Sequence, residues 1–239
     1  MNDLSGKTVV VIGGTSGIGL ETARQARAAD AAVIVTGRNR ERLDATRDEL
    51  KATAVPLDLG DPAALDEFFA ALPDRVDHVL VSGGGPLYVP LAEMDFDQAR
   101  RSLDEHLIGT LRIAEDCATR VRPGGSLTLI GGTGARRAGV GLTLIAMVSA
   151  AFEAVVRDLA VEIAPVRVNL IAPGFVDTPL SAQLLGADLE RRRQELRDTL
   201  PIRRVVGPDD VAALALHLMT NPALTGATYD VDGGQQLTS

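Results

Sequence analysis

The feature that most constrains the fold is a glycine-rich turn between the first predicted strand and the first predicted helix. A β-branched run at Val9 to Ile12 leads directly into Gly13-Gly14-Thr15-Ser16-Gly17-Ile18-Gly19. Glycines let a backbone turn tightly and approach a phosphate, and the free amides of a helix N-terminus favour negative charge. A merely tight strand-to-helix turn is the alternative, but strand, loop, helix and second strand follow in the order that a dinucleotide-binding unit requires. The turn therefore predicts a nucleotide site.

Short apolar runs alternate with longer helical patterns along the whole chain. The predicted strands are Val9 to Ile12, Ala32 to Thr36, Ala54 to Leu57, His78 to Val81, Ser126 to Ile130, Arg167 to Ile171 and Ala227 to Val231. The predicted helices are Ile18 to Ala28, Glu41 to Lys51, Pro62 to Ala71, Phe96 to Val121, Leu144 to Ala164 and Pro208 to Met219. Strands without polar alternation are typical of a parallel sheet buried on both faces. We expect an α/β fold, a Rossmann-like doubly wound parallel sheet of about seven strands with helices on both faces.

A single domain is the simplest interpretation of residues 1–239, because no internal repeat and no linker of distinct composition interrupts the pattern. The one irregular stretch is Phe175 to Arg204, which contains a charged helical pattern around Asp188 to Asp198. Enzymes with α/β folds place mobile lids in such long connections. We therefore expect a substrate-side lid or loop near residues 175–204.

Charge and cysteine content narrow the partners and the compartment. Asp and Glu number 32 and Lys and Arg number 24, which gives a net charge of −8. Nucleic-acid and anionic-membrane surfaces require a basic footprint, so we expect neither partner. Cys117 is the only cysteine, so no intrachain disulfide can form, which fits a reducing compartment and favours the cytoplasm. The longest weakly charged run, Gly139 to Val156, contains Glu153 and is better explained by a buried helix than by a membrane span.

The end of the second predicted strand indicates which cofactor the site takes. An acidic residue about 20 positions past the glycines would hold the ribose 2′-hydroxyl of NAD. The strand instead ends Val35-Thr36-Gly37-Arg38. Gly37 removes the acid, and the Arg38 guanidinium, with Arg40 nearby, offers a bidentate grip on a 2′-phosphate. We expect NADP(H) rather than NAD(H), because the alternative, that both arginines are exposed loop charges, leaves Gly37 without a reason.

Three motifs resemble the short-chain dehydrogenase/reductase family. The G-x-x-x-G-x-G spacing of the turn differs from the G-x-G-x-x-G fingerprint and is similar to the family's first loop, with Ile12 at its Thr position. Arg167 to Gly174 resembles the family's R-V-N-x-I-x-P-G strand and turn, and Val231 to Gly234 resembles its V-D-G-G strand. The resemblance spans nearly all 239 residues.

This resemblance implies cofactor contacts from the glycine turn, from the ends of the third and fourth predicted strands, and from the turn after the sixth. The residues so implied are Gly13, Thr15, Ser16, Gly17, Ile18, Gly19, Asp58, Leu59, Ser82, Gly83, Gly84, Pro173, Gly174, Val176 and Thr178. Asp58 stands at the family's adenine-edge position, and Val176 and Thr178 stand where family members flank the nicotinamide amide. The fourth-strand residues replace an N-N-A-G motif without either Asn, although their small size still lets the chain pass close to the cofactor ribose.

The family's catalytic residues are missing. The resembled family uses a Ser, a Tyr and a Lys in a Y-x-x-x-K arrangement, with a helical Asn completing a proton relay. The chain has only two lysines, Lys7 and Lys51, and only two tyrosines, Tyr88 and Tyr229, so no such pair exists in any register.

Alignment to the family's strand and helix shows what replaces these residues. Gly132 stands at the Ser, Ile145 at the Tyr, Ser149 at the Lys and His106 at the helical Asn. The helix around Ile145 is apolar, which indicates changed chemistry on a retained fold. Losing a positioned general acid costs about 10² to 10⁴ in rate, so ordinary ketone reduction is expected to be slow.

The catalytic residues are thus unknown, with two weak candidates. His106 could supply a proton because an imidazole titrates near neutral pH, although a lone helical histidine is more often packed or solvated. Thr133 could donate a hydrogen bond to a substrate oxygen, although capping of the following turn is the simpler interpretation. Arg136 and Arg137 could grip a substrate carboxylate, although paired exposed arginines are commoner.

The sequence leaves two classes of function open. The first is an NADP(H)-dependent oxidoreductase with an atypical proton route, acting on an unknown small molecule such as an activated double bond or an imine. The second is a catalytically inactive nucleotide-binding pseudoenzyme with a sensor or structural role; a non-redox enzyme using the same pocket lies between them.

We also expect self-association. The resembled family pairs subunits through the helices predicted at Phe96 to Val121 and Leu144 to Ala164. Small side chains on the second helix permit close packing, namely Ala146, Ala150, Ala151 and Ala154. The resemblance therefore implies a homo-oligomer, a tetramer or a dimer.

Overall fold

Seven strands form one parallel sheet in the computed structural model, which describes residues 3–238. The strands are β1 (Thr8–Ile12), β2 (Ala32–Gly37), β3 (Thr53–Pro56), β4 (Val76–Val81), β5 (Val121–Ile130), β6 (Arg167–Pro173) and β7 (Thr228–Val231). Only β5 departs clearly from its predicted bounds, because it begins at Val121 rather than at Ser126. The predicted α/β fold with a parallel sheet is confirmed.

The strand order places a crevice between β1 and β4. The order is β3-β2-β1-β4-β5-β6-β7, and every neighbouring pair is parallel. The chain runs outward from β1 to β3 and then returns to pair β4 with β1, with Val9 opposite His78. In open α/β sheets, ligands bind beyond the carboxyl ends of the strands where the order reverses. The turns that follow Ile12 and Val81 therefore border the expected site.

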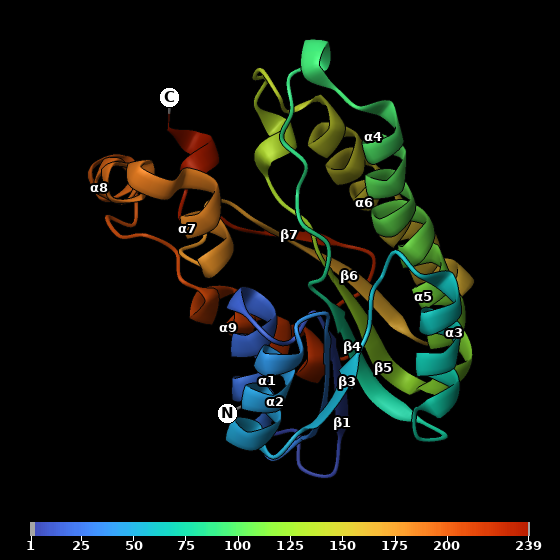
Figure 1. The fold of residues 1–239 in the computed structure, drawn as a ribbon. Coiled ribbons are helices and arrows are strands. Elements are labelled where there is room, and N and C mark those ends of the chain that lie inside the picture. Colours follow the sequence, from blue (N-terminus) through green and yellow to red (C-terminus); the bar gives the residue numbers. More distant parts are fainter. Residues whose placement is uncertain (1–2, 239) are drawn as a thin grey trace.

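One face of the sheet is covered by α3 (Pro62–Ala71), α5 (Gly109–Arg120) and α6 (Thr143–Glu162). These helices lie together on one side of the strands (Figure 1). Phe69 and Phe152 belong to the apolar cluster that they form with the sheet. Because these helices bury this face of the sheet, the strand side chains that point toward them are mostly apolar.

The opposite face is covered by α1 (Gly17–Ala28), α2 (Arg40–Leu50) and α9 (Pro208–Thr220). Figure 1 shows these three helices on the other side of the sheet. Leu43 and Val211 belong to the second apolar cluster, which these helices form with the strands. Because both faces are buried, the strands are mostly apolar and lack the alternation of polar and apolar residues seen in a half-exposed sheet.

Side chains fix the starts of two helices that border the site. Asn39 accepts a hydrogen bond from the amide of Arg42 at the start of α2. Asp61 accepts hydrogen bonds from the amides of Ala63 and Ala64 at the start of α3. Such caps satisfy donors that have no partner inside the helix and stabilise it by about 1 kcal/mol.

The predicted helix from Phe96 to Val121 is wrong in its middle and at its end. The chain forms α4 (Phe96–Leu103), a π-helical turn (Asp104–Ile108) and then α5, while Val121 already belongs to β5. A π turn inserts an extra residue into the helical ladder and is frequent at functional sites. Here the turn contains His106.

The stretch from Phe175 to Arg204 is more helical than expected. It contains α7 (Pro179–Leu185), a 3₁₀ turn (Gly186–Asp188) and α8 (Leu189–Thr199). Only α8 corresponds to the predicted charged helix. Both helices lie beyond the end of the sheet, next to the C-terminal segment (Figure 1).

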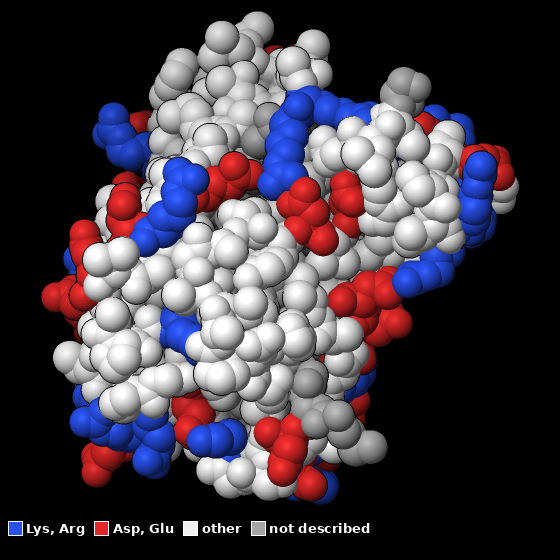
Figure 2. All heavy atoms as spheres, turned by 180° about the vertical axis from the view of Figure 1, so that it is seen from behind, with Lys and Arg blue, Asp and Glu red and all other residues white. Residues whose placement is uncertain are grey.

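The surface carries charges of both signs. From behind, acidic and basic side chains lie side by side around a broad area that has no charged side chains (Figure 2). This face therefore has no single-sign field. Among the helices that the structure describes, none is both long enough and apolar enough to cross a lipid bilayer.

Candidate active site

The glycine turn is packed so closely that no side chain fits at two of its positions. Gly13 has a φ of 83°, a conformation that favours glycine, and a Cβ atom there would lie 2.7 Å from the amide nitrogen of Gly83. A Cβ atom on Gly19 would collide with the carbonyl oxygen of Gly13. Backbone therefore packs against backbone where the β1 turn, α1 and the loop after β4 meet.

The start of α1 lies next to Ser16, which lines the cleft, and no side chain caps its amides. Ser16 is the N-cap residue, but its side chain makes no capping hydrogen bond, and the first turn has no acidic residue. The amides of Gly13 and Gly14 are already donated to the side-chain and carbonyl oxygens of Thr36. The first amides of a helix have no partner within the helix, so those of α1 suit a phosphate.

Two arginines stand at the outer end of the cleft. Arg38 follows β2, Arg42 lies in the first turn of α2, and both line the cleft together with Asn39. Neither guanidinium forms a salt bridge with an acidic side chain within residues 3–238. The predicted helper Arg40 is not among the residues that line the cleft, so its contact with a phosphate stays a prediction; Arg42, in the first turn of α2, lines the cleft together with Arg38.

Packing within the protein explains why position 37 is a glycine. A Cβ atom at this position would lie 2.7 Å from the hydroxyl oxygen of Thr15. The sequence argument that only a phosphate could explain Gly37 is therefore wrong, because packing against Thr15 already excludes a side chain. The case for a 2′-phosphate depends on the unpaired guanidinium groups of Arg38 and Arg42.

The cleft gathers many of the predicted cofactor contacts around about 1060 Å³ of space that opens to solvent. The predicted residues that line it are Gly13, Thr15, Ser16, Arg38, Leu59, Ser82, Gly83 and Gly84. The sequence missed Asn39, Arg42, Gly85, Glu105, Pro179, Leu180 and Gln183, which also line it. The last three lie on α7, for which no helix was predicted, and Arg42 lies in the first turn of α2, outside the strand-end motif that pointed to Arg38.

The other predicted contacts of the glycine turn lie behind the cleft wall. Gly17, Ile18 and Gly19 open α1 and are not among its lining residues. Gly17 is a neighbour of Thr178, since a Cβ atom there would lie 3.4 Å from the Thr178 methyl group. The turn after β6 thus approaches the glycine turn, as the resemblance implies.

Asp58 is exposed and turned toward its own loop. Its carboxylate accepts the amide of Gly60 at 3.1 Å, and it does not line the cleft. Pro173, Gly174 and Val176, at and after the end of β6, do not line it either. Their contacts with a cofactor stay predictions.

The positions aligned with the missing catalytic residues are small or apolar. A Cβ atom on Gly132 would meet only the carbonyl oxygen of Pro173, at 3.6 Å. Ile145 and Ser149 lie one turn apart on α6, and Ser149 is buried. None of these three residues can act as a tyrosine proton donor or supply a lysine's positive charge.

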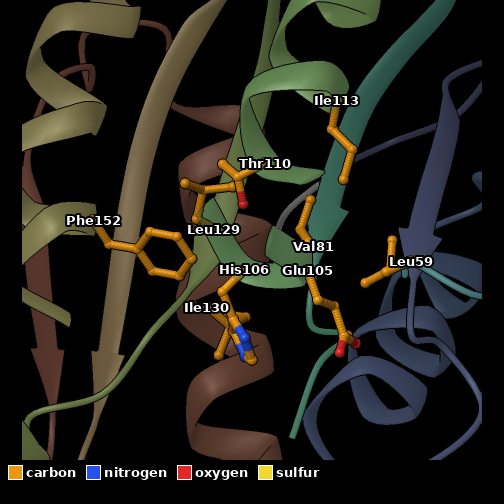
Figure 3. Close-up of a pocket in the computed structure, with 10 residues that line it drawn as sticks. Leu59, Val81, Glu105, His106, Thr110, Ile113, Leu129, Ile130 and Phe152 are labelled. Atoms are coloured by element: carbon orange, nitrogen blue, oxygen red, sulfur yellow. The ribbon is translucent and has the colours of Figure 1, made fainter. Parts of the chain in front are cut away.

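His106 reaches the loop after β4 from the π turn. Its Nδ1 lies 2.7 Å from the carbonyl oxygen of Ser102 and must donate to it. Its Nε2 faces Gly84, where a Cβ atom would lie 2.8 Å away. In Figure 3 the His106 and Glu105 side chains point the same way, with Leu59 on the Glu105 side. In the neutral ring, Nε2 is therefore the free acceptor.

Thr133 joins the end of β5 to the end of β6. The residue is buried, and both its amide, at 2.9 Å, and its hydroxyl, at 3.4 Å, donate to the carbonyl oxygen of Pro173. Its own carbonyl accepts the amide of Arg136. The hydroxyl makes no capping hydrogen bond to the following 3₁₀ turn (Gly134–Arg136), so the capping interpretation is wrong; its hydrogen is used by β6 instead.

Arg136 and Arg137 tie neighbouring segments together. The Arg136 guanidinium bridges Glu153 on α6, at 3.0 Å, and Asp230 on β7. The hydrogen bond that Arg136 donates to the Asp230 carboxylate is the main cause of the raised pKa of Arg136. Arg137 donates to the carbonyl oxygen of Gln235 at 2.6 Å. Both guanidinium groups already have partners in the protein. The structure therefore matches neither alternative, arginines free to bind a substrate carboxylate or exposed arginines without partners.

Two other reactive side chains lie outside the cleft. His78 is buried with its Nδ1 2.9 Å from the Ser126 hydroxyl, and burial, assisted by the charge of Arg167, lowers its pKa to about 4. Burial also raises the pKa of the Cys117 thiol, which keeps it unreactive. No group of three His, Cys, Asp or Glu side chains within residues 3–238 is placed to hold a metal ion.

Comparisons with known proteins agree with this geometry. A family model described as enoyl-(acyl carrier protein) reductase matches residues 13–236. The chain is 28% identical to the short-chain dehydrogenase/reductase malC of Malbranchea aurantiaca over 98% of this chain and 96% of that protein. It is also 28% identical to the 3-oxoacyl-[acyl-carrier-protein] reductase FabG of Aquifex aeolicus, over 97% of this chain and 98% of that one.

Solved structures show the same architecture. The structure described as MalC reductase/Diels-Alderase from Malbranchea aurantiaca has a TM-score of 0.90 at 28% identity and covers 98% of this chain and 97% of that one. A small-chain dehydrogenase in complex with NADPH has a TM-score of 0.82 at 29% identity, with coverage of 97% and 99%.

Proposed function

The chain belongs to the short-chain dehydrogenase/reductase family, and from this premise we propose that it is an NADP(H)-binding oxidoreductase without a Ser-Tyr-Lys proton relay. The observation that carries the proposal is the pair Arg38 and Arg42, which line the cleft without acidic partners within residues 3–238. Two unpaired guanidinium groups suit a 2′-phosphate, which NADP(H) has and NAD(H) lacks. The solved relative described as an NADPH complex supports this choice.

The residues present fit this cofactor along the whole cleft. The uncapped amides of α1 suit the pyrophosphate, and the closely packed Gly13 lets the backbone approach it. Ser82, Gly83 and Gly84 line the cleft and would border the ribose, and the turn with Pro173, Gly174, Val176 and Thr178 would hold the nicotinamide end. Thr178 is already placed against the glycine turn.

Bound NADPH supplies a hydride, and reduction of a carbonyl also requires a proton. With Gly132, Ile145 and Ser149 in the catalytic positions, this chain has no tyrosine donor there. The Thr133 hydroxyl is engaged, which leaves the protonated form of His106 as the candidate donor, because only that form carries a proton on Nε2, which faces Gly84. We assign as substrates small molecules that need little acid assistance, such as an activated double bond or an imine.

The test compares cofactor binding with cofactor turnover. Purified protein is titrated with NADPH by calorimetry, and NADPH oxidation is then measured with separate panels of ketones, activated alkenes and imines. The proposal predicts binding together with turnover of alkenes or imines. Binding without turnover on any panel contradicts the oxidoreductase function, and absence of binding contradicts the cofactor assignment.

A second candidate function is a protein that uses the pocket without redox turnover. This function is favoured because all four positions aligned with the family's proton relay are replaced, by His106, Gly132, Ile145 and Ser149. The sheet is intact all the same. The relative described as a reductase/Diels-Alderase supports a pocket that is not limited to redox chemistry. NADPH binding that raises the melting temperature without any turnover would favour this function.

Residues 175–204 are proposed as the substrate-side lid. Pro179, Leu180 and Gln183 of α7 line the cleft opposite the residues after β4. The salt bridge of 2.7 Å between Arg193 and Asp177 fastens α8 to the start of this segment. Closure predicts slower proteolysis of α7 when NADPH is present, and an unchanged cleavage rate would contradict it.

Self-association is proposed through the helices that the family pairs. Exposed apolar side chains lie on α5 and α6 and on the π turn, including Ile108, Leu111, Met147 and Val161. The area without charged side chains seen from behind supports association as well (Figure 2). Light scattering is expected to give a homo-oligomer, a tetramer rather than a dimer, whereas a monomeric mass at micromolar concentration would contradict this. The single buried Cys117 supports a cytoplasmic location.

A further inference from the structure

A carboxylate that the sequence analysis did not single out lines the cofactor cleft. Glu105 lies in the π turn and borders the cleft together with Leu59, Gly83 and Gly84. It is half-buried, and it forms no hydrogen bond or salt bridge with any residue in the range 3–238. A partly buried carboxylate without donors is costly unless a ligand supplies them.

The residue expected to read the adenine edge is poorly placed to do so. Asp58 is exposed and does not line the cleft, and its carboxylate accepts the amide of Gly60 at 3.1 Å. The next residue, Leu59, does line the cleft and reaches the loop after β4: a Cβ atom on Gly83 would lie 2.5 Å from a Leu59 methyl group. The wall beside Leu59 is therefore completed from the π turn, by Glu105.

The π turn is the reason that this carboxylate can reach the cleft. Glu105 and His106 are consecutive, yet both side chains point past the ends of the strands, with Glu105 on the side of Leu59 and His106 on the other side (Figure 3). His106 faces Gly84 and is not among the residues that line the cleft, whereas Glu105 lines the same cleft as Arg38. Glu105 is therefore the side chain of this pair that a ligand in the cleft would meet.

Charge decides which part of a cofactor Glu105 can contact. The phosphate groups repel a carboxylate, and they are accounted for by the α1 amides and by Arg38 and Arg42. In the adenosine half, the purine donor is the 6-amino group, and a carboxylate accepts hydrogen bonds only. We infer that Glu105, rather than Asp58, accepts a hydrogen bond from the 6-amino group of adenine.

This assignment rests on the proposed NADP(H) binding and adds a specificity to it. A 6-oxo purine places a carbonyl oxygen where adenine has its amino group, so it would face the Glu105 carboxylate with an acceptor. A hydrogen bond to a charged group contributes about 1.5 to 3 kcal/mol, which corresponds to a discrimination of about 10- to 100-fold. The protein is therefore expected to bind an adenine dinucleotide at least about tenfold more tightly than the corresponding dinucleotide with a 6-oxo purine.

The experiment measures dissociation constants by calorimetry for NADPH and for its hypoxanthine analogue. The wild type is expected to bind NADPH at least about tenfold more tightly than the analogue. Glu105→Gln is nearly isosteric, and its amide can present either a donor or an acceptor, so the ratio is expected to fall below about threefold. Asp58→Asn is the matched control and is expected to keep the wild-type ratio.

The outcomes separate this inference from the proposed function. A ratio unchanged in Glu105→Gln but lost in Asp58→Asn overturns the inference and leaves NADP(H) binding intact. A wild type that binds both dinucleotides equally also overturns it. A wild type that binds neither overturns the proposed function together with the inference. Arg38→Ala is expected to weaken both dinucleotides by the same factor, and thermal melting verifies that each variant is folded.

Discussion

The two sides of the cleft differ in what holds them in place. On the nucleotide side, backbone atoms of the β1 turn, α1 and the loop after β4 touch one another, and Gly13 and Gly19 leave no space for a side chain. On the catalytic side, Gly132 faces open space, and Ile145 and Ser149 are ordinary positions on a helix. The first side is defined by backbone geometry and the second by side-chain identity.

This difference explains how one side can change while the other stays. A substitution in the glycine turn disturbs the packing of β1 against β4, so it damages fold and binding together. A substitution at Ile145 changes chemistry without moving any strand, because α6 packs through other residues such as Phe152 and Val156. Catalytic groups can therefore be lost from a sheet that still binds a nucleotide.

The largest effect is expected from adding one methyl group to the glycine turn, and the same addition on the catalytic side is its control. Gly13→Ala forces a Cβ atom against the Gly83 amide at a φ of 83°, and we expect it to destabilise the protein by about 2 to 4 kcal/mol. NADPH affinity is expected to fall by at least about a hundredfold. Urea unfolding and calorimetric titration measure the two quantities.

Gly132→Ala is the matched control for that substitution. A Cβ atom there meets only one oxygen, at 3.6 Å, so stability should change by less than about 0.5 kcal/mol and NADPH affinity should stay the same. Equal losses of stability and of NADPH affinity in Gly13→Ala and Gly132→Ala would contradict the distinction between the two sides.

The second effect concerns the arginine end of the nucleotide side. Arg38→Asp replaces the charge beside the expected 2′-phosphate, and NADPH affinity should fall by about 10- to 100-fold while NADH affinity falls less or rises. Arg40→Asp is the control, because Arg40 does not line the cleft. Titrations with both cofactors measure the preference, and equal wild-type affinities for NADPH and NADH would contradict the assignment.

A third prediction uses a residue that belongs to neither side. Burial lowers the pKa of His78 to about 4, below its ordinary value, so the unfolded chain takes up a proton first as pH falls. The stability that His78 contributes is therefore complete above pH 6.5 and is lost toward pH 4, by about 2 kcal/mol at pH 5.

The check is the pH dependence of unfolding in a matched pair. His78→Asn keeps a partner for the Ser126 hydroxyl and should show a shallower loss of stability between pH 6.5 and 5 than the wild type. Identical slopes in the two proteins would show that His78 titrates normally.

The smallest expected effect is a gain on the catalytic side. Gly132→Ser, Ile145→Tyr and Ser149→Lys together should raise ketone reduction by about tenfold, because the nucleotide side is already built. The gain is limited because a new lysine in this apolar helix is partly desolvated. Each single substitution should do little, since these groups act as a unit. Steady-state NADPH oxidation with a simple ketone measures the gain, and no gain in a folded triple variant would contradict the account.

The parts of the fold that the sequence predicts well are those set by local pattern. Apolar runs such as Val9 to Ile12 locate the strands, because a strand buried on both faces has no solvent-facing row of polar residues. The π turn was missed, because one extra residue in a helix leaves the spacing of apolar residues nearly unchanged. The short helix α7 was missed because its seven residues are too few for a periodic signal.

Site prediction follows the same division. Gly13 and Gly19 are recognisable because only glycine fits where they stand. Arg42 and Glu105 are not recognisable from a motif, because α2 and the π turn bring them to the cleft from outside the glycine turn. Gly37 shows the converse case, in which a residue with a packing reason was interpreted as a cofactor signal.

The central claim is that the nucleotide side is retained and the standard catalytic side is not. The most direct test gives the wild-type protein NADPH and simple ketones at neutral pH and measures binding and oxidation in the same preparation. The account predicts NADPH binding with negligible ketone reduction. Brisk reduction that is abolished in His106→Ala and retained in Thr133→Ala would contradict it and would identify the helical histidine as the proton donor.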